Sequence, residues 1–156
     1  AEGTPPGGPS AGGPARQFKA EDLMRLLNYV GQGLQQASRG RCGQPAELVE
    51  AVRSATEALV WGEKHDGALF DLFCERQTLA GFVSALLTPQ TPQTVRVQLL
   101  QSLSIMVQNA RRDTSFYYLL SGGHLNQLLA GEPDLRDEEV LAYYVAFIKS
   151  LALRLD

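Results

Sequence analysis

The chain of 156 residues lacks the features that mark several common classes of protein. It has two cysteines, Cys42 and Cys74, with no Cys-x-x-Cys pair or Cys/His cluster, which is typical of free thiols in a reducing compartment. Neither sign of charge dominates: the net charge is −3 and the pI about 5.4, so we expect no nucleic-acid partner. The longest apolar run, residues 140–148, is far shorter than the roughly 20 residues that span a membrane. We therefore expect any membrane association to be peripheral.

The first 17 residues, "AEGTPPGGPSAGGPARQ", contain few side chains that could form a core. Such a composition predicts a disordered Gly/Pro-rich tail or linker, and its prolines lack the spacing and basic anchor of a PxxP ligand. The chain has no initiating Met and no signal peptide, so we expect Ala1 to begin a fragment or a processed chain. Residues 18–156 are expected to form one folded unit.

From residue 18 onward the apolar residues follow helical spacing, and no stretch alternates as a strand does. Leu23, Leu27, Val30 and Leu34 show this period in the first segment. Glycine and proline interrupt the pattern at "RGRCGQP", "TPQTP" and "GEPD". The sequence predicts an all-α fold with helices over residues 18–34, 46–64, 68–75, 79–87, 93–111, 115–120 and 125–130, and a final helix that begins at 137–139.

An internal repeat organises these helices. "AVRSATEALVWG" aligns with "QLLQSLSIMVQN" and "AYYVAFIKSLAL" at offsets of 47 and 44 residues, and each of the first two segments is followed by two short predicted helices. Three helices in about 45 residues are typical of armadillo and HEAT repeats. We therefore predict an armadillo/HEAT-like α-solenoid of about three helical repeats.

The helix predicted over 93–111 carries a polar stripe. Gln101, Ser104 and Gln108 recur at spacings of three and four residues, which places them on one helical face. Amide side chains in such a stripe can pair with the backbone of an extended peptide, and we take these residues as candidate partner-binding residues. The alternative is a solvated face without a ligand.

The stretch "TSFYYLLSGGHLNQLL" (residues 114–129) is compatible with a reactive loop or with a joint between two helices. No nucleophile elbow surrounds Ser121, no phosphate-loop pattern surrounds Gly122 and Gly123, and His124 has no neighbouring metal ligands. The corresponding stretch of the preceding repeat, "GALFDLFCERQTLAGFVSALL", has neither Ser-Gly-Gly nor histidine. We therefore predict a helix joint, no enzyme activity, no metal and no cofactor.

Two tyrosine pairs and the last helix are further candidates for protein contacts. Adjacent residues of a helix point in different directions, so one member of Tyr117/Tyr118 and of Tyr143/Tyr144 can be buried while the other reaches a partner. The last helix is apolar nearly all round, whereas a terminal repeat normally has a polar outer face. We expect either the remainder of its own chain or a partner to cover it.

The blocks "AVRSATEALVWGEKHDGALFDLF", "VQLLQSLSIMVQN", "TSFYYLLS" and "DEEVLAYYVAFIKSLALRL" resemble successive segments of the FPL domain of the C-type-lectin-domain family 16 member A proteins, called Ema in flies. The resemblance covers residues 18–155. The Phe-Pro-Leu tripeptide of the domain's name is absent, the Gly/Pro-rich head is unlike the family's start, and family members continue well beyond this chain.

The resemblance implies a non-catalytic scaffold of membrane trafficking, active in endosome maturation, autophagy, mitophagy and lysosomal delivery. It implies a cytoplasmic location peripheral to endosomal or lysosomal membranes, and as partners the HOPS tethering machinery and a RING-type ubiquitin ligase. The alternative is an armadillo/HEAT-type adaptor in an unrelated pathway such as nuclear transport or cytoskeletal assembly, which has the same physical features.

Overall fold

The computed structural model describes residues 17–155. The tail predicted over residues 1–17 lies outside this range except for Gln17. Within it the chain forms helices and no strand, which confirms the all-α prediction: α1 (Ala20–Ser38), α2 (Pro45–His65), α3 (Ala68–Glu75), α4 (Thr78–Leu86), α5 (Gln93–Asn109), α6 (Asp113–Ser121), α7 (His124–Ala130) and α8 (Glu138–Leu155).

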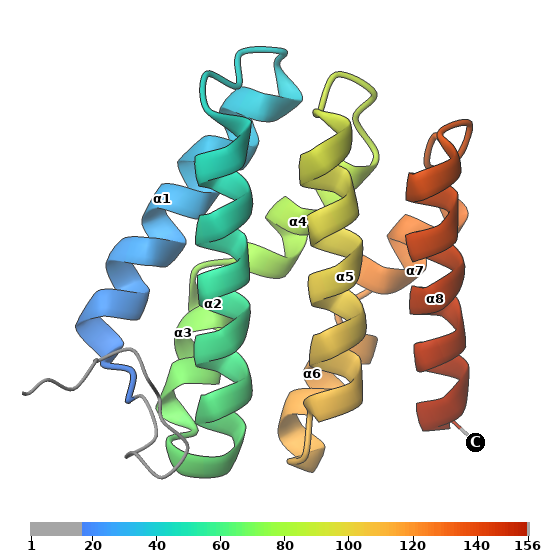
Figure 1. Cartoon of the computed structure of the whole chain (residues 1–156). Helices are drawn as coiled ribbons and strands as arrows, with labels where there is room; N and C mark the ends of the chain where they lie inside the picture. The colour runs from blue at the N-terminus through green and yellow to red at the C-terminus, as the bar shows by residue number, and fades with distance from the viewer. Residues whose placement is uncertain (1–16, 156) are drawn as a thin grey trace, which may run out of the picture.

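The long helices α2, α5 and α8 stand side by side, α1 lies beside α2, and the short helices α3, α4, α6 and α7 lie behind them (Figure 1). Helix α5 packs against α2 on one side and against α8 on the other, while α1 packs against α2 and α4. The buried apolar residues of all eight helices form one core cluster, in which Phe73, Phe82 and Phe147 are among the largest fully buried side chains. Helices α2, α5 and α8 therefore present a layer whose outer side is not covered by another helix of residues 17–155.

Local sequence explains where the helices begin and end. Pro45 starts α2 at a position where a missing N–H costs nothing, and Asp137 caps α8 by accepting hydrogen bonds from the backbone N–H groups of Glu139 and Val140 at 2.9 and 3.1 Å. Gly40, with a positive φ of 73°, follows the end of α1.

The two pairs of short helices turn through the same backbone conformation. Gln77, between α3 and α4, has φ 57°, and Gly123, between α6 and α7, has φ 82°. Both residues occupy the left-handed region, which glycine enters without a steric penalty and glutamine does not. The Ser-Gly-Gly-His stretch is thus a helix joint, as predicted, and its counterpart in the preceding repeat keeps the turn without glycine.

Polar side chains join the long helices at residues about 45 positions apart. Between α2 and α5, the hydroxyls of Thr56 and Ser102 lie 2.8 Å apart in a buried site, and Gln98 donates to Ser102 at 3.0 Å. Between α5 and α8, Gln108 donates to the Ser150 hydroxyl at 2.7 Å. A buried polar group needs a hydrogen-bond partner, and a shift of one helix along the other would remove it. These bonds therefore help to fix the register of the neighbouring helices.

Candidate protein-binding surface

The outer side of α5 exposes a narrower polar stripe than the sequence predicts. Gln101 and Gln108 lie at the surface, seven residues apart, and Thr94 continues the stripe one further heptad toward the N-terminus. Ser104 is buried, and its hydroxyl has no hydrogen-bond partner among the described residues. The structure therefore places two of the three predicted stripe residues where a partner can reach them.

The side-chain amides of Gln101 and Gln108 differ in their hydrogen bonds. Gln108 is bonded to Ser150 of α8, so part of its hydrogen-bonding capacity serves the fold. Gln101 makes no hydrogen bond within residues 17–155 and faces an open groove between α2 and α5. Of the predicted stripe, Gln101 is thus the residue best placed to bind another molecule.

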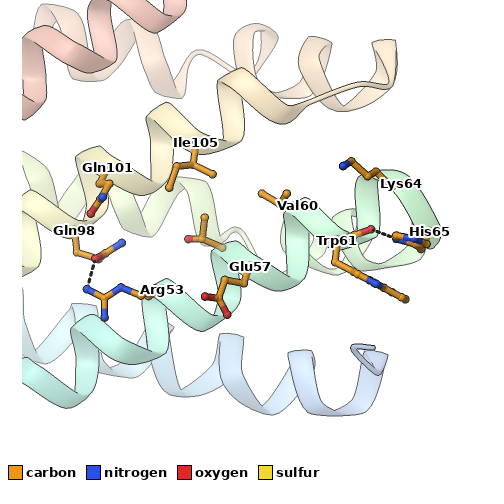
Figure 2. Close-up of a pocket in the computed structure, with 10 residues that line it drawn as sticks. Arg53, Glu57, Val60, Trp61, Lys64, His65, Gln98, Gln101 and Ile105 are labelled. Atoms are coloured by element: carbon orange, nitrogen blue, oxygen red, sulfur yellow. Dashed lines mark hydrogen bonds between the residues drawn. The ribbon is translucent and has the colours of Figure 1, made fainter. Parts of the chain in front are cut away.

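The groove itself was not predicted from the sequence. It has a volume of about 540 Å³, and its walls come from α2 and α5. Figure 2 shows Arg53 of α2 bonded to Gln98 of α5, with Trp61 and His65 toward one end. Its lining residues are Arg53, Thr56, Glu57, Val60, Trp61, Lys64, His65, Gln98, Gln101 and Ile105. A signal available in the sequence is Trp61, a large aromatic residue at the end of an apolar helical face.

Trp61 is half-buried at one end of this groove. Its indole stacks on the ring of His65, with centroids 4.6 Å apart, and contacts the ring of Phe18 at 5.9 Å. His65 in turn lies within hydrogen-bonding distance of the Trp61 carbonyl, at 3.0 Å. These contacts hold the indole in place while leaving part of it exposed.

The first tyrosine pair separates as adjacent helical residues should. Tyr117 is 71% exposed on α6, whereas Tyr118 is half-buried and packs edge-on against Phe70 with centroids 5.7 Å apart. Burial raises the pKa of Tyr118, and the neighbouring Cys74 raises it further. Burial likewise raises the pKa of the Cys74 thiol to about 11, with Asp71 adding to the shift. Tyr117 is therefore the member of the pair that a partner can reach. The raised pKa keeps the Cys74 thiol protonated at neutral pH.

The second pair, Tyr143 and Tyr144, is half-buried, and both side chains pack against the core. Neither lies free at the surface as Tyr117 does. Around them α8 exposes an apolar face formed by Leu141, Val145, Ile148, Ala152 and Leu155, residues spaced by three or four. Leu141 and Val145 are each 41% exposed, and Leu155 is 61% exposed. We call these five residues the outer face of α8.

The other candidate features of the sequence, Ser121 and His124, are not part of an assembled site within residues 17–155. Ser121 ends α6 and His124 begins α7 on either side of the glycine joint. Between residues 17 and 155 no group of three or more His, Cys, Asp or Glu side chains is arranged to hold a metal ion. No helix in that range is long and apolar enough to cross a membrane.

The fold and surface define an all-α protein in which a unit of one long and two short helices recurs and whose exposed features suit protein contacts. A family described as "FPL: Uncharacterised conserved protein" matches residues 52–156. The chain belongs to this FPL family, as the resemblance of its blocks predicts.

Relatives occur in animals and plants. The chain is 37% identical over 153 residues to the "Protein CLEC16A homolog" of Drosophila melanogaster, covering 96% of the chain and 14% of the relative. It is 42% identical over 109 residues to "Protein CLEC16A" of Homo sapiens, covering 70% and 10%. It is 39% identical over 109 residues to "Protein TRANSPARENT TESTA 9" of Arabidopsis thaliana, covering 70% and 13%.

The chain thus spans between a tenth and a seventh of the length of these relatives. No solved structure matches it.

Proposed function

We propose that the chain is a non-catalytic helical-repeat scaffold of a membrane-trafficking protein, which acts in endosome maturation, autophagy, mitophagy and lysosomal delivery through protein–protein interactions. Membership of the FPL family and similarity to the CLEC16A proteins support this proposal. By the same family resemblance, the proposed partners are the HOPS tethering machinery and a RING-type ubiquitin ligase. The proposed location is cytoplasmic, peripheral to endosomal or lysosomal membranes.

We propose further that the helices form an armadillo-type solenoid. The order of one long and two short helices occurs in α2 to α4 and again in α5 to α7, and α8 begins a third unit. The left-handed links at Gln77 and Gly123 fall at matching positions of the two units, and side-chain hydrogen bonds join α2 to α5 and α5 to α8. This arrangement favours a solenoid over an irregular helical bundle because each unit contacts chiefly its neighbours.

The single observation that carries the scaffold proposal is the outer face of α8. In the repeat alignment, Leu141 and Ile148 correspond to Val97 and Ser104 of α5. Val97 and Ser104 lie on the same helical face as Gln108, which bonds to α8. The outer face of α8 thus repeats the face that α5 presents to its neighbour. We propose that it is covered in the same way, by the remainder of the same polypeptide in a longer protein.

Site-specific crosslinking tests this proposal. A photoreactive amino acid is placed at position 145 or, as a matched control on the same helix, at position 153; Leu153 is 77% exposed but lies off the outer face. In the full-length protein expressed in cells, we expect position 145 to crosslink within its own polypeptide and position 153 to do so far less. Crosslinks from position 145 to nuclear-transport or cytoskeletal proteins would instead support an adaptor in those pathways.

A functional readout accompanies the crosslinking. We expect the double variant Leu141→Lys with Val145→Lys to impair lysosomal degradation of an endocytosed cargo in cells that lack the native protein. We expect Leu153→Lys to restore degradation as the unaltered protein does. Full restoration by the double variant would contradict the role assigned to this face.

A further inference from the structure

The groove between α2 and α5 is elongated rather than round. Its lining runs along α2 from Arg53 to His65, a separation of twelve residues or about 18 Å at the helical rise of 1.5 Å per residue. An extended chain advances about 3.3 Å per residue, so about five residues of extended peptide match this length. The volume of about 540 Å³ is within the range of sites that bind small ligands and peptide side chains.

The base of the groove is apolar where the two helices approach each other. Val60 from α2 and Ile105 from α5 are half-buried there, and Figure 2 shows them on the facing sides of the two helices. Trp61, which is also half-buried, lies at one end of the groove. Because such side chains are only partly shielded from water, an apolar side chain that packs on them removes further apolar surface from solvent. Trp61 is also held by its contacts with Phe18 and His65, so little side-chain entropy is lost on binding.

The polar groups around this base favour an acidic peptide. Arg53 and Lys64 lie toward opposite ends of the lining and Glu57 is its single acid, so the lining side chains carry a formal charge of +1 in a chain whose net charge is −3. The Arg53 guanidinium forms an ion pair with Glu50 and donates a hydrogen bond to Gln98. Lys64 has no ion-pair partner within residues 17–155. Among the cations of the lining, Lys64 is therefore the one whose ammonium group is not paired within the described part of the chain.

The side-chain amide of Gln101 can form hydrogen bonds with the backbone of an extended peptide. Its amide has one acceptor oxygen and two N–H donors, none of them used within the described residues. An amide that faces an open groove can bond both the N–H and the C=O of one peptide residue. In contrast, the Gln98 amide is already engaged with Arg53 and Ser102.

We propose that this groove binds an extended, acidic peptide segment of another protein. Apolar side chains at alternate positions of the peptide pack on Trp61, Val60 and Ile105, an acidic side chain pairs with Lys64, and Gln101 bonds the peptide backbone. The inference rests on the proposed scaffold function only in that the chain binds proteins, and it uses a surface separate from the outer face of α8.

Fluorescence of Trp61 tests the proposal directly, because it is the only tryptophan of the chain. The probe is the peptide Ser-Glu-Leu-Thr-Leu-Glu-Ser, titrated into the 156-residue chain with excitation of tryptophan alone. Two matched peptides replace either both Glu by Lys or both Leu by Ser. We expect a saturable change in Trp61 emission with the first peptide and affinities at least about threefold weaker with the other two.

A charge reversal identifies the cation. We expect Lys64→Glu to weaken binding of the acidic peptide by about three- to tenfold, the range for an exposed ion pair replaced by a repulsive one, and to strengthen binding of the lysine peptide. Lys149→Glu, the same change at an exposed position of α8, is the matched control and should leave both affinities unchanged. Circular dichroism confirms that both variants keep their helices.

The opposite outcomes overturn the inference. If no peptide changes Trp61 emission at millimolar concentration, or if the acidic and basic peptides bind equally and Lys64→Glu alters neither, the groove does not bind acidic peptides. The double variant Leu141→Lys with Val145→Lys should not affect the peptide affinities. Failure of the groove assay therefore leaves the scaffold proposal to be decided by the outer face of α8.

Discussion

The carboxylate of Glu63, at the end of α2, binds Arg112 at the start of α6, 49 residues further along the chain. One carboxylate oxygen accepts hydrogen bonds from the backbone N–H groups of Arg111 and Arg112 at 2.8 and 3.1 Å. The other accepts from the Arg112 guanidinium at 3.2 Å and from the Ser115 hydroxyl at 2.6 Å. The Glu63 side chain is only 5% exposed, and it places a negative charge at the N-terminus of α6, where the helix dipole favours it.

Removing this carboxylate should destabilise the protein. Burial raises the pKa of Glu63, but the hydrogen bonds from Ser115, Arg112 and Arg111 outweigh burial and hold its pKa below the usual 4.5. We expect Glu63→Gln to lower the free energy of unfolding by about 2 kcal/mol at pH 7, since buried donors lose an ionised acceptor. Urea denaturation measures the change, and Glu75→Gln, at an exposed position, should cost less than about 0.5 kcal/mol.

The same carboxylate should make stability depend on pH. Because its pKa is lower in the folded than in the unfolded protein, its contribution is present above about pH 4.5 and is lost as the pH falls through the lower folded value. We therefore expect the difference in unfolding free energy between the unaltered protein and Glu63→Gln to shrink between about pH 5 and pH 3. A difference that stays constant over this range would show that the carboxylate is not ionised preferentially in the fold.

Substitutions at the two left-handed joints should have opposite effects on the free energy of unfolding. Gln77 has φ 57° and Gly123 φ 82°, and a non-glycine residue in this region costs about 1 kcal/mol or more. We expect Gln77→Gly to be neutral or to raise the unfolding free energy by up to about 1 kcal/mol, and Gly123→Ala to lower it by about 1–2 kcal/mol. A destabilised Gln77→Gly variant would mean that the glutamine side chain contributes more than its backbone costs.

Helix α8 should be the least protected of the long helices. Its contacts are made chiefly with α5, whereas α5 packs against both α2 and α8. We expect Phe147→Ala, which empties a fully buried site in α8, to cost about 3 kcal/mol or more. Hydrogen exchange should show α8 amides exchanging faster in this variant while α2 and α5 remain protected. Leu153→Ala, at an exposed position of the same helix, should change neither quantity.

The two tyrosines of α6 should differ in how much they contribute to stability. Tyr117 is 71% exposed, so Tyr117→Ala should change the unfolding free energy by less than about 0.5 kcal/mol. Tyr118 packs edge-on against Phe70, and Tyr118→Ala should cost about 2–3 kcal/mol, with Tyr118→Phe recovering most of the loss. Thermal denaturation of the three variants checks the order. Equal effects of the two alanine variants would contradict the placement of the pair.

Much of the helical structure follows from local sequence. The period of Leu23, Leu27, Val30 and Leu34 predicted α1, which extends four residues beyond the expected end at Leu34 to Ser38. Proline and glycine marked the breaks, and the final helix begins within the predicted range 137–139, with Asp137 as its cap. Capping and periodicity are properties of neighbouring residues, so they can be read from one stretch of sequence at a time.

The candidate site was only partly predictable. Spacing placed Ser104 on the same stripe as Gln101 and Gln108, but the edge of α5 that carries Ser104 is buried in the packed fold. The groove at Trp61 and Gln101 was missed because its walls come from two helices whose lining residues are separated by more than 30 positions in the sequence.

The sequence by itself determined the helices, their order, the recurrence of the long helix with two short ones, and the family. The tertiary structure alone decided which polar residues stay at the surface, which carboxylate binds the start of α6, and where α2 and α5 leave a groove. The physical reason is that helix formation depends on contacts three and four residues apart. Exposure and pairing depend on which helices pack against each other, here at separations such as the 49 residues between Glu63 and Arg112.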